Sequence, residues 1–243
     1  MLFVAMALCA LCAGTLATRG VRAREDVAVA AATGLALFLW LPYLLARPLG
    51  IATGARAAAG ALALLAVAGV WRVAASGGGG RRAASPGPLF VVALLTAVVG
   101  GFLYNASLRV RDGNLCSAGG GCEDMGMHAT LAHAFLGSHA EIVSPTYPIF
   151  HGWPLGYPFL ADFSAAVGMA LGASPGLAFF ASAVFALAAL MAAAWAVARR
   201  WLPPWPAALA MVLLLLGGNA GFIYFFRDLP SAGLAGTWAN RCT

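Results

Sequence analysis

The chain has 243 residues, of which 62% are hydrophobic and only 9% are charged, and its mean hydropathy is +0.88. Ordinary soluble domains contain about 45–50% apolar and about 25% charged residues, so this composition excludes a soluble domain and indicates an integral membrane protein. The net charge of +6 comes from fourteen arginines and no lysine, placed singly or in pairs. That spacing is typical of charges that set membrane topology and argues against a nucleic-acid surface.

Seven stretches are apolar enough to be membrane helices. A helix needs about twenty apolar residues to cross about 30 Å of hydrocarbon, because lipid cannot satisfy open backbone groups. We therefore expect an all-α, polytopic bundle of about seven spans with an outward loop that carries an interfacial amphipathic helix. The predicted spans cover residues 1–18, 27–46, 57–75, 88–104, 155–172, 176–198 and 206–226.

A glycine-rich linker divides the chain. In "SGGGGRRAASPGP" the glycines favour a flexible segment, and Arg81 and Arg82 resist translocation, so residues 76–87 are expected on the cytoplasmic side. The N-terminal membrane helices then occupy residues 1–75, and a second membrane region occupies residues 88–243. That region ends in "AGTWANRCT", in a polar turn just after the seventh span, so we expect it to be truncated.

The arginines also suggest an orientation. If residues 19–24 and the linker face the cytoplasm, the N-terminus and the loop 105–154 face outward. In a seven-span topology Arg199 and Arg200 then fall on the outer side, against the usual bias.

Cys116 and Cys122 flank the glycine-rich sequence "CSAGGGC" in this loop. A short flexible loop can close a disulfide, and disulfides persist in oxidising compartments, which suits an exported segment. Two unpaired thiols are the alternative.

Polar chemistry is concentrated between residues 112 and 151. Four of the eight carboxylates and all four histidines lie there. Residues 123–136 are good helix formers, and a 3.6-residue period puts Asp124, His128, Leu131 and Phe135 on one face and His133 on the opposite side. We expect this helix to lie in the membrane interface with its acids facing water or a cavity. Asp124 and His128 are suitably spaced to hold a cation together, although Asp124 also fits a helix-capping role.

A proline-rich stretch follows, "SPTYPIFHGWPLGYPFLADF". Its prolines forbid regular helix and predict a defined path by which the chain re-enters the bilayer, and its aromatic residues suit the membrane interface. Asp162 falls about one turn into the predicted fifth span, where a carboxylate should face protein, water or a partner rather than lipid.

These features resemble the GT-C superfamily, polytopic glycosyltransferases that use polyprenyl-phosphate sugar donors. The resemblance covers roughly residues 105–230 and is carried by the outward acid, by "GWPLGYPFLADF", by the turn "GASPG" and by "AVARRW". The chain looks still more like prokaryotic membrane proteins placed near that group, which have an Asp-x-x-x-His element before a similar stretch. The four spans predicted before the loop depart from the GT-C pattern, which usually has one.

The resemblance implies a multi-pass protein of the bacterial cell membrane that moves a sugar from a polyprenyl-phosphate donor to an acceptor on the outer face, in contact with the lipid bilayer and with no nucleic acid partner. Asp124 is the expected catalytic base or metal ligand, with Glu123 or Asp112 in its place as alternatives. A divalent cation, if used, would be held by Asp124 and His128. The residues expected to contact the substrate are His128, Arg109, Arg111, His151, Tyr157 and Asp162.

Two other functions remain open from the sequence, so enzyme activity itself is not decided. A transporter or channel subunit would line a polar path with Asp162 and Asn219, and an assembly subunit would perform no chemistry.

Overall fold

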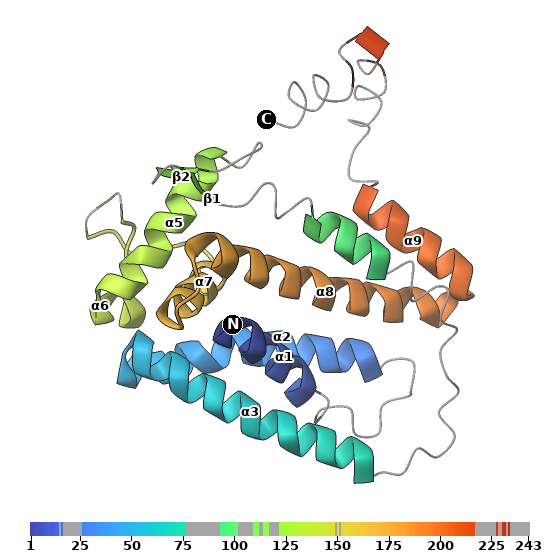
Figure 1. The fold of residues 1–243 in the computed structure, drawn as a ribbon, viewed down its shortest axis with the longest axis horizontal. Helices are drawn as coiled ribbons and strands as arrows, with labels where there is room; N and C mark the ends of the chain where they lie inside the picture. Colours follow the sequence, from blue (N-terminus) through green and yellow to red (C-terminus); the bar gives the residue numbers. More distant parts are fainter. Residues whose placement is uncertain are drawn as a thin grey trace.

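The computed structural model describes residues 1–14, 16, 26–75, 93–101, 109–111, 114–116, 122–148, 150, 152–216, 227, 230–231 and 233. For residues 26–27, 72–73, 109–111, 114–116 and 122–124 the description covers the backbone alone. The described part is predominantly helical, with one short hairpin (Figure 1). Its elements are α1 (Leu2–Gly14), α2 (Asp26–Leu49), α3 (Ile51–Ala75), a helical segment at 93–101, β1 (Arg109–Arg111), β2 (Asn114–Cys116), α5 (Cys122–Gly137), α6 (His139–Val143), α7 (Leu160–Ala170), α8 (Pro175–Trp201) and α9 (Pro204–Leu216).

Three of the described helices are long and apolar enough to cross a membrane, which confirms the membrane class predicted from composition. They are Ala28–Leu49 in α2, Ile51–Trp71 in α3 and Pro175–Trp201 in α8. The other apolar helices are shorter, with 13 residues in α1, 11 in α7 and 13 in α9. The full set of seven spans therefore stays a prediction.

The turn between α2 and α3 is shorter than predicted. We expected a break at residues 47–56, but Gly50 alone separates the two helices, with a φ of 76°. A glycine adopts this left-handed conformation without steric cost, so a single residue can end one helix and begin the next. Pro42 and Pro48 both lie inside α2, where each lacks the amide that would donate to the preceding turn.

Small residues and aromatic rings hold the long helices together. A Cβ on Gly54 of α3 would lie 2.5 Å from the Cα of Ala46 in α2, so the two backbones approach closely. The ring of Phe38 in α2 contacts Phe3 of α1 and Phe185 of α8. We call α1, α2, α3 and α8 the long-helix bundle.

A second group of helices, α5, α6 and α7, covers one end of this bundle, and we call it the cap. Rings of Tyr43, Phe135, Phe159 and Phe163 join α2, α5 and α7. In Figure 1 the cap, the α2–α3 turn and the start of α8 all lie at the left end of the molecule. The start of α2, the end of α3 and the end of α8 lie at the right end.

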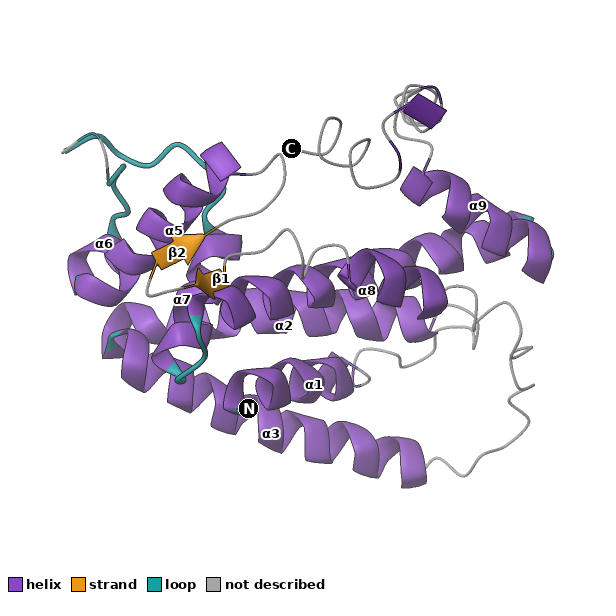
Figure 2. Cartoon of the chain, turned by 45° about the horizontal axis from the view of Figure 1, so that its top comes forward, coloured by secondary structure: helices purple, strands orange, loops and turns teal. Residues whose placement is uncertain are grey.

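The hairpin formed by β1 and β2 lies at the cap end of the molecule (Figure 2), where β1 contacts α8. The strands pair antiparallel, with Val110 opposite Leu115. The sequence predicted an all-α chain, and the pair of strands β1 and β2 differs from that prediction. The sequence signal was the two-residue connection Asp112–Gly113, a combination typical of tight hairpins.

Candidate functional site

The site is built on α5, which forms where the sequence predicted a helix at residues 123–136. Leu131 and Phe135 are each 1% exposed, so they form the buried face that the helical period predicted. His133 lies on the exposed side, where its Nδ1 donates a hydrogen bond to the carbonyl of Ala129 at 2.8 Å. The apolar face of α5 packs against α7 of the same chain. The interfacial placement of the helix remains a prediction.

Helix α7 supplies a buried carboxylate. Asp162 is the third residue of α7 and is only 2% exposed. Its position in the first turn suits a negative charge, because the positive end of the helix dipole lies there. Of the three surroundings expected for Asp162, which were protein, water or a partner, the structure shows protein.

His128 and Asp162 meet between α5 and α7. The Nδ1 of His128 lies 2.7 Å from Oδ1 of Asp162, and their side chains are 23% and 2% exposed. A neutral imidazole that donates from Nδ1 to a carboxylate has its lone pair on Nε2. The geometry thus fixes the ring orientation and leaves Nε2 as the nitrogen able to accept a proton.

The pair has an energetic reason to stay together. A carboxylate buried without a partner costs several kcal/mol in low-dielectric surroundings, and a hydrogen-bonded imidazole offsets part of that cost. Oδ2 of Asp162 is buried and has no hydrogen-bond partner among the described residues. Asp162 therefore depends on His128, and removal of the imidazole would leave the carboxylate unpaired.

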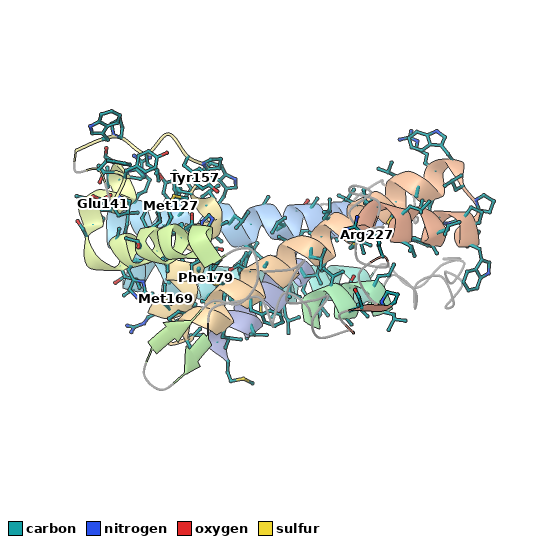
Figure 3. The ribbon with its side chains drawn as sticks, turned by 90° about the horizontal axis from the view of Figure 1, so that it is seen from above. Met127, Glu141, Tyr157, Met169, Phe179 and Arg227 are labelled. Atoms are coloured by element: carbon teal, nitrogen blue, oxygen red, sulfur yellow. The ribbon has the colours of Figure 1, made fainter. Side chains whose placement is uncertain are left out.

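Tyr157 completes this group. Its ring centroid lies 5.9 Å from that of His128, and the side chain is 37% exposed. Figure 3 shows Tyr157 close to Met127, the residue before His128 on α5. The aromatic ring therefore lies beside the partly exposed imidazole, where a ligand would reach both.

The loop that leads to Tyr157 is held by defined bonds, as its prolines predicted. The Tyr147 amide donates to the Trp153 carbonyl at 3.0 Å, and the Leu155 amide donates to the Pro145 carbonyl at 2.9 Å. Glu141 of α6 closes the base of the loop, because its carboxylate accepts from both the amide and the hydroxyl of Thr146, each at 2.7 Å. Phe150 and Trp153 of this loop are 60% and 66% exposed.

An open, mostly apolar cavity of about 240 Å³ lies nearby, between the α2–α3 turn and the α5–α6 turn. Its walls include Leu49, Phe135, His139 and Ile142. Phe135 also contacts Phe163, the residue after Asp162. The His128–Asp162 pair does not line the cavity, but Phe135 lines it and also packs against α7, the helix that carries Asp162.

Several predicted site residues lie outside what the structure describes. Glu123 and Asp124 are in the first turn of α5, and Arg109 and Arg111 are in β1, but their side chains are beyond the description. Asp112, His151 and Asn219 lie wholly outside it, and the transporter hypothesis therefore rests on Asp162 alone within the described residues.

Cys116 ends β2 and Cys122 begins α5. Their side chains lie outside the description as well, so the disulfide stays a prediction.

The described residues do not supply a cation site. No group of three or more His, Cys, Asp or Glu side chains suitable for a metal occurs among them. The Nδ1 of His128 is already committed to Asp162, and the carboxylate of Asp124 lies outside the description. We therefore derive no chemical step through a metal.

Sequence patterns single out both His128 and Asp162 but do not connect the two residues. They are 34 residues apart, on different helices. The sequence contained only an indirect signal for this contact. A carboxylate inside an apolar helix needs a polar partner. Among the histidines of α5, His128 has the helical spacing that places it on the buried face. The Glu141–Thr146 contact was also missed.

No family model matches the sequence, and no curated protein or solved structure is significantly similar to it. The resemblance to GT-C enzymes therefore stays a prediction, and the chemistry of the His128–Asp162–Tyr157 group carries the functional argument.

Proposed function

We propose that the chain is a membrane glycosyltransferase, in which His128 takes the proton from an acceptor hydroxyl while a sugar leaves a polyprenyl-phosphate donor. The single observation that carries the proposal is the 2.7 Å contact between His128 Nδ1 and a carboxylate that is 2% exposed. This arrangement moves the role of general base from Asp124, the residue expected from the resemblance, to His128.

The reaction balances with these groups. The acceptor oxygen attacks the anomeric carbon, its proton moves to Nε2 of His128, and the bond from the anomeric carbon to the phosphate oxygen breaks with its electron pair on the phosphate. Asp162 holds the imidazole in the tautomer that can accept the proton and stabilises the imidazolium that forms. A positioned general base of this kind contributes about 10²–10⁴-fold to the rate.

The surroundings of the pair suit a lipid-linked sugar. Aromatic rings commonly supply the apolar contact surface of small-molecule sites, and Tyr157 lies beside His128. The apolar cavity beside Phe135 and the exposed faces of the long helices offer contact for a polyprenyl chain. On this proposal the protein spans the bacterial inner membrane several times, and Arg109 and Arg111 of the hairpin remain the arginines expected to balance the charge of the departing phosphate.

The experiment uses the full chain in proteoliposomes, with undecaprenyl phosphate carrying tritiated glucose or mannose as donor and a bacterial membrane extract as acceptor. We expect His128→Gln and Asp162→Asn each to lower transfer about 100-fold or more, since each removes the oriented base. His133→Gln is the matched control, because it changes a histidine on the exposed side of the same helix. Asp124→Asn tests the earlier assignment in the same assay.

A structural role for the pair makes a different prediction. If His128 and Asp162 only tie α5 to α7, both variants lose thermal stability in detergent, and the fraction that remains folded transfers sugar at the normal rate. A second readout is the modification of histidines by diethyl pyrocarbonate, in which undecaprenyl phosphate should protect His128 and leave His133 reactive. Normal transfer by folded His128→Gln would overturn the proposal.

A further inference from the structure

Helix α7 is too short to cross a bilayer, and the chain on either side of it stays at one end of the molecule. Its 11 residues extend about 16 Å at 1.5 Å per residue, against about 30 Å of hydrocarbon. The loop before α7 and the start of α8 after it lie at the end where α2 turns into α3 (Figure 1). Helix α8 has 27 residues, about 40 Å, and runs from that end to the opposite one.

We propose that α7 is a re-entrant helix, which dips into the bilayer and returns to the side from which it came, so that α8 is the first crossing after the cap. This topology differs from the seven-span prediction, in which residues 155–172 cross the membrane. It reverses the direction of α8 and places the end of α8 in the cytoplasm. The inference concerns topology and holds whether or not the chain transfers a sugar.

The arginines favour the re-entrant topology. Of the twelve arginines before residue 204, eight are close in sequence to the start of α2, the end of α3 or the end of α8. These are Arg19, Arg22, Arg24, Arg72, Arg81, Arg82, Arg199 and Arg200. The remaining four are Arg47, Arg56, Arg109 and Arg111. A crossing α7 would move Arg199 and Arg200 to the other side and leave six on each, whereas cytoplasmic ends of membrane helices carry an excess of arginine.

The polar contacts of α7 fit a helix that enters the membrane only partway. Its buried residues include Asp162 and Ser164, and the Ser164 hydroxyl bonds to Ser182 of α8 at 2.9 Å. Within a membrane, irregular or interrupted helices are tolerated where they are buried in protein. Residues 162–168 of α7 are buried against the rest of the chain, so lipid does not meet its polar groups.

Exposed aromatic residues mark both membrane surfaces. At one end, Phe150 and Trp153 are exposed in the loop between α6 and α7. At the other end, Trp201 and Trp205 are 73% and 63% exposed at the junction of α8 and α9. Aromatic belts lie at the two interfaces of a membrane protein, which are about 40–45 Å apart when the headgroup regions are included. The length of α8 matches that separation. The cap and the His128–Asp162 pair then face the outside, and α9 begins on the cytoplasmic side.

The test is cysteine labelling in intact cells. Cys9, Cys12, Cys116, Cys122 and Cys242 are replaced by serine, and single cysteines are introduced as Ser144→Cys in the cap and Leu202→Cys after α8, both exposed positions. A membrane-impermeant maleimide should label the first in intact cells and the second at least 10-fold more after permeabilisation. In the seven-span topology both introduced cysteines would be labelled in intact cells. That result, or any other pattern of labelling at positions 144 and 202, would overturn the inference.

A second measurement covers the case in which the cysteine-free chain does not fold. Because the natural sequence contains no lysine, Ser144→Lys or Leu202→Lys introduces the only lysine side chain without changing any cysteine. An impermeant amine reagent followed by peptide mass spectrometry should modify Lys at position 144 in intact cells and Lys at position 202 only after permeabilisation. Modification of both in intact cells overturns the proposal as before.

Discussion

The cap and the long-helix bundle are held together by different interactions. Between α1, α2, α3 and α8 the contacts are close backbone approaches at glycine and tilted or edge-on ring contacts at Phe38. In the cap, ring contacts are joined by polar bonds: His128 to Asp162, Glu141 to Thr146, and Ser164 to Ser182 of α8. Both regions contain apolar residues, so hydropathy alone does not distinguish them.

The difference follows from the solvent. In lipid there is no hydrophobic driving force between helices, so close packing and a few polar bonds decide which helices meet. The long helices can pack closely because small residues along their length let the backbones approach. In the cap, polar bonds at fixed points add to the packing of the short helices and specify their arrangement.

The sharpest way to break the cap is Phe163→Ala. Phe163 is 0% exposed and its ring contacts Tyr43 and Phe135, so truncation leaves a cavity where α2, α5 and α7 meet. We expect a loss of about 3–5 kcal/mol, as for buried aromatic truncations elsewhere. Thermal unfolding in detergent measures it. Phe150→Ala, at a 60% exposed ring, should change stability by far less. Equal losses from the two would show that the aromatic cluster does not hold the cap.

The corresponding change in the long-helix bundle is Gly54→Ala. The new methyl group would meet the backbone of Ala46 at 2.5 Å, so α2 and α3 must separate, at a cost of about 1–3 kcal/mol typical of overpacking. Gly60→Ala on the same helix is the matched control, because nothing lies within 4 Å of its Cβ. There the higher helix propensity of alanine should leave stability equal or slightly higher. A stable Gly54→Ala protein would contradict the close approach.

Glu141→Gln tests whether the polar bonds of the cap act locally. The amide side chain loses the charge and one of the two acceptors that hold Thr146, which should cost about 1–2 kcal/mol in the opening of the loop. Hydrogen exchange of the Thr146 amide should accelerate, while the amides of α3 keep their protection. Unchanged exchange at Thr146 would mean that Glu141 does not close the loop.

The smallest effect is expected for Ser182→Ala, which removes the bond between α7 and α8. Interhelical hydrogen bonds in membranes average about 0.6 kcal/mol, and the Ser164 hydroxyl keeps its bond to the Ala161 carbonyl at 2.7 Å. Thermal unfolding of Ser182→Ala, Ser164→Ala and the double variant would give the coupling between them. Strictly additive losses would show that the contact contributes nothing.

The sequence predicted best those elements that local composition determines. Helix α8 was expected at residues 176–198 and occupies Pro175–Trp201, because a long apolar run, the Ser174 N-cap and Pro175 all favour the same start. Helix α5 agrees to within one residue at each end. The α2–α3 turn was placed too widely, since the ability of Gly50 to reverse the chain alone depends on how closely two helices pack.

The site was predicted in part. His128 and Asp162 were selected because ionisable groups are rare in such a chain, but their contact depends on the angle at which α5 crosses α7. Sequence periodicity fixes the face of a helix and says nothing about the partner that covers it. For the same reason the proline-rich loop was expected to follow a fixed path, while the carboxylate that anchors it, Glu141, was not identified.

Gly50 leaves little freedom in chain length between α2 and α3, because it is the single residue that separates the two helices. A residue inserted within α3 would rotate the part of the helix after it by about 100° relative to the part before it, and so turn the surface that meets α2 toward lipid. The one-residue connection at Gly50 contains no loop that could absorb such a change.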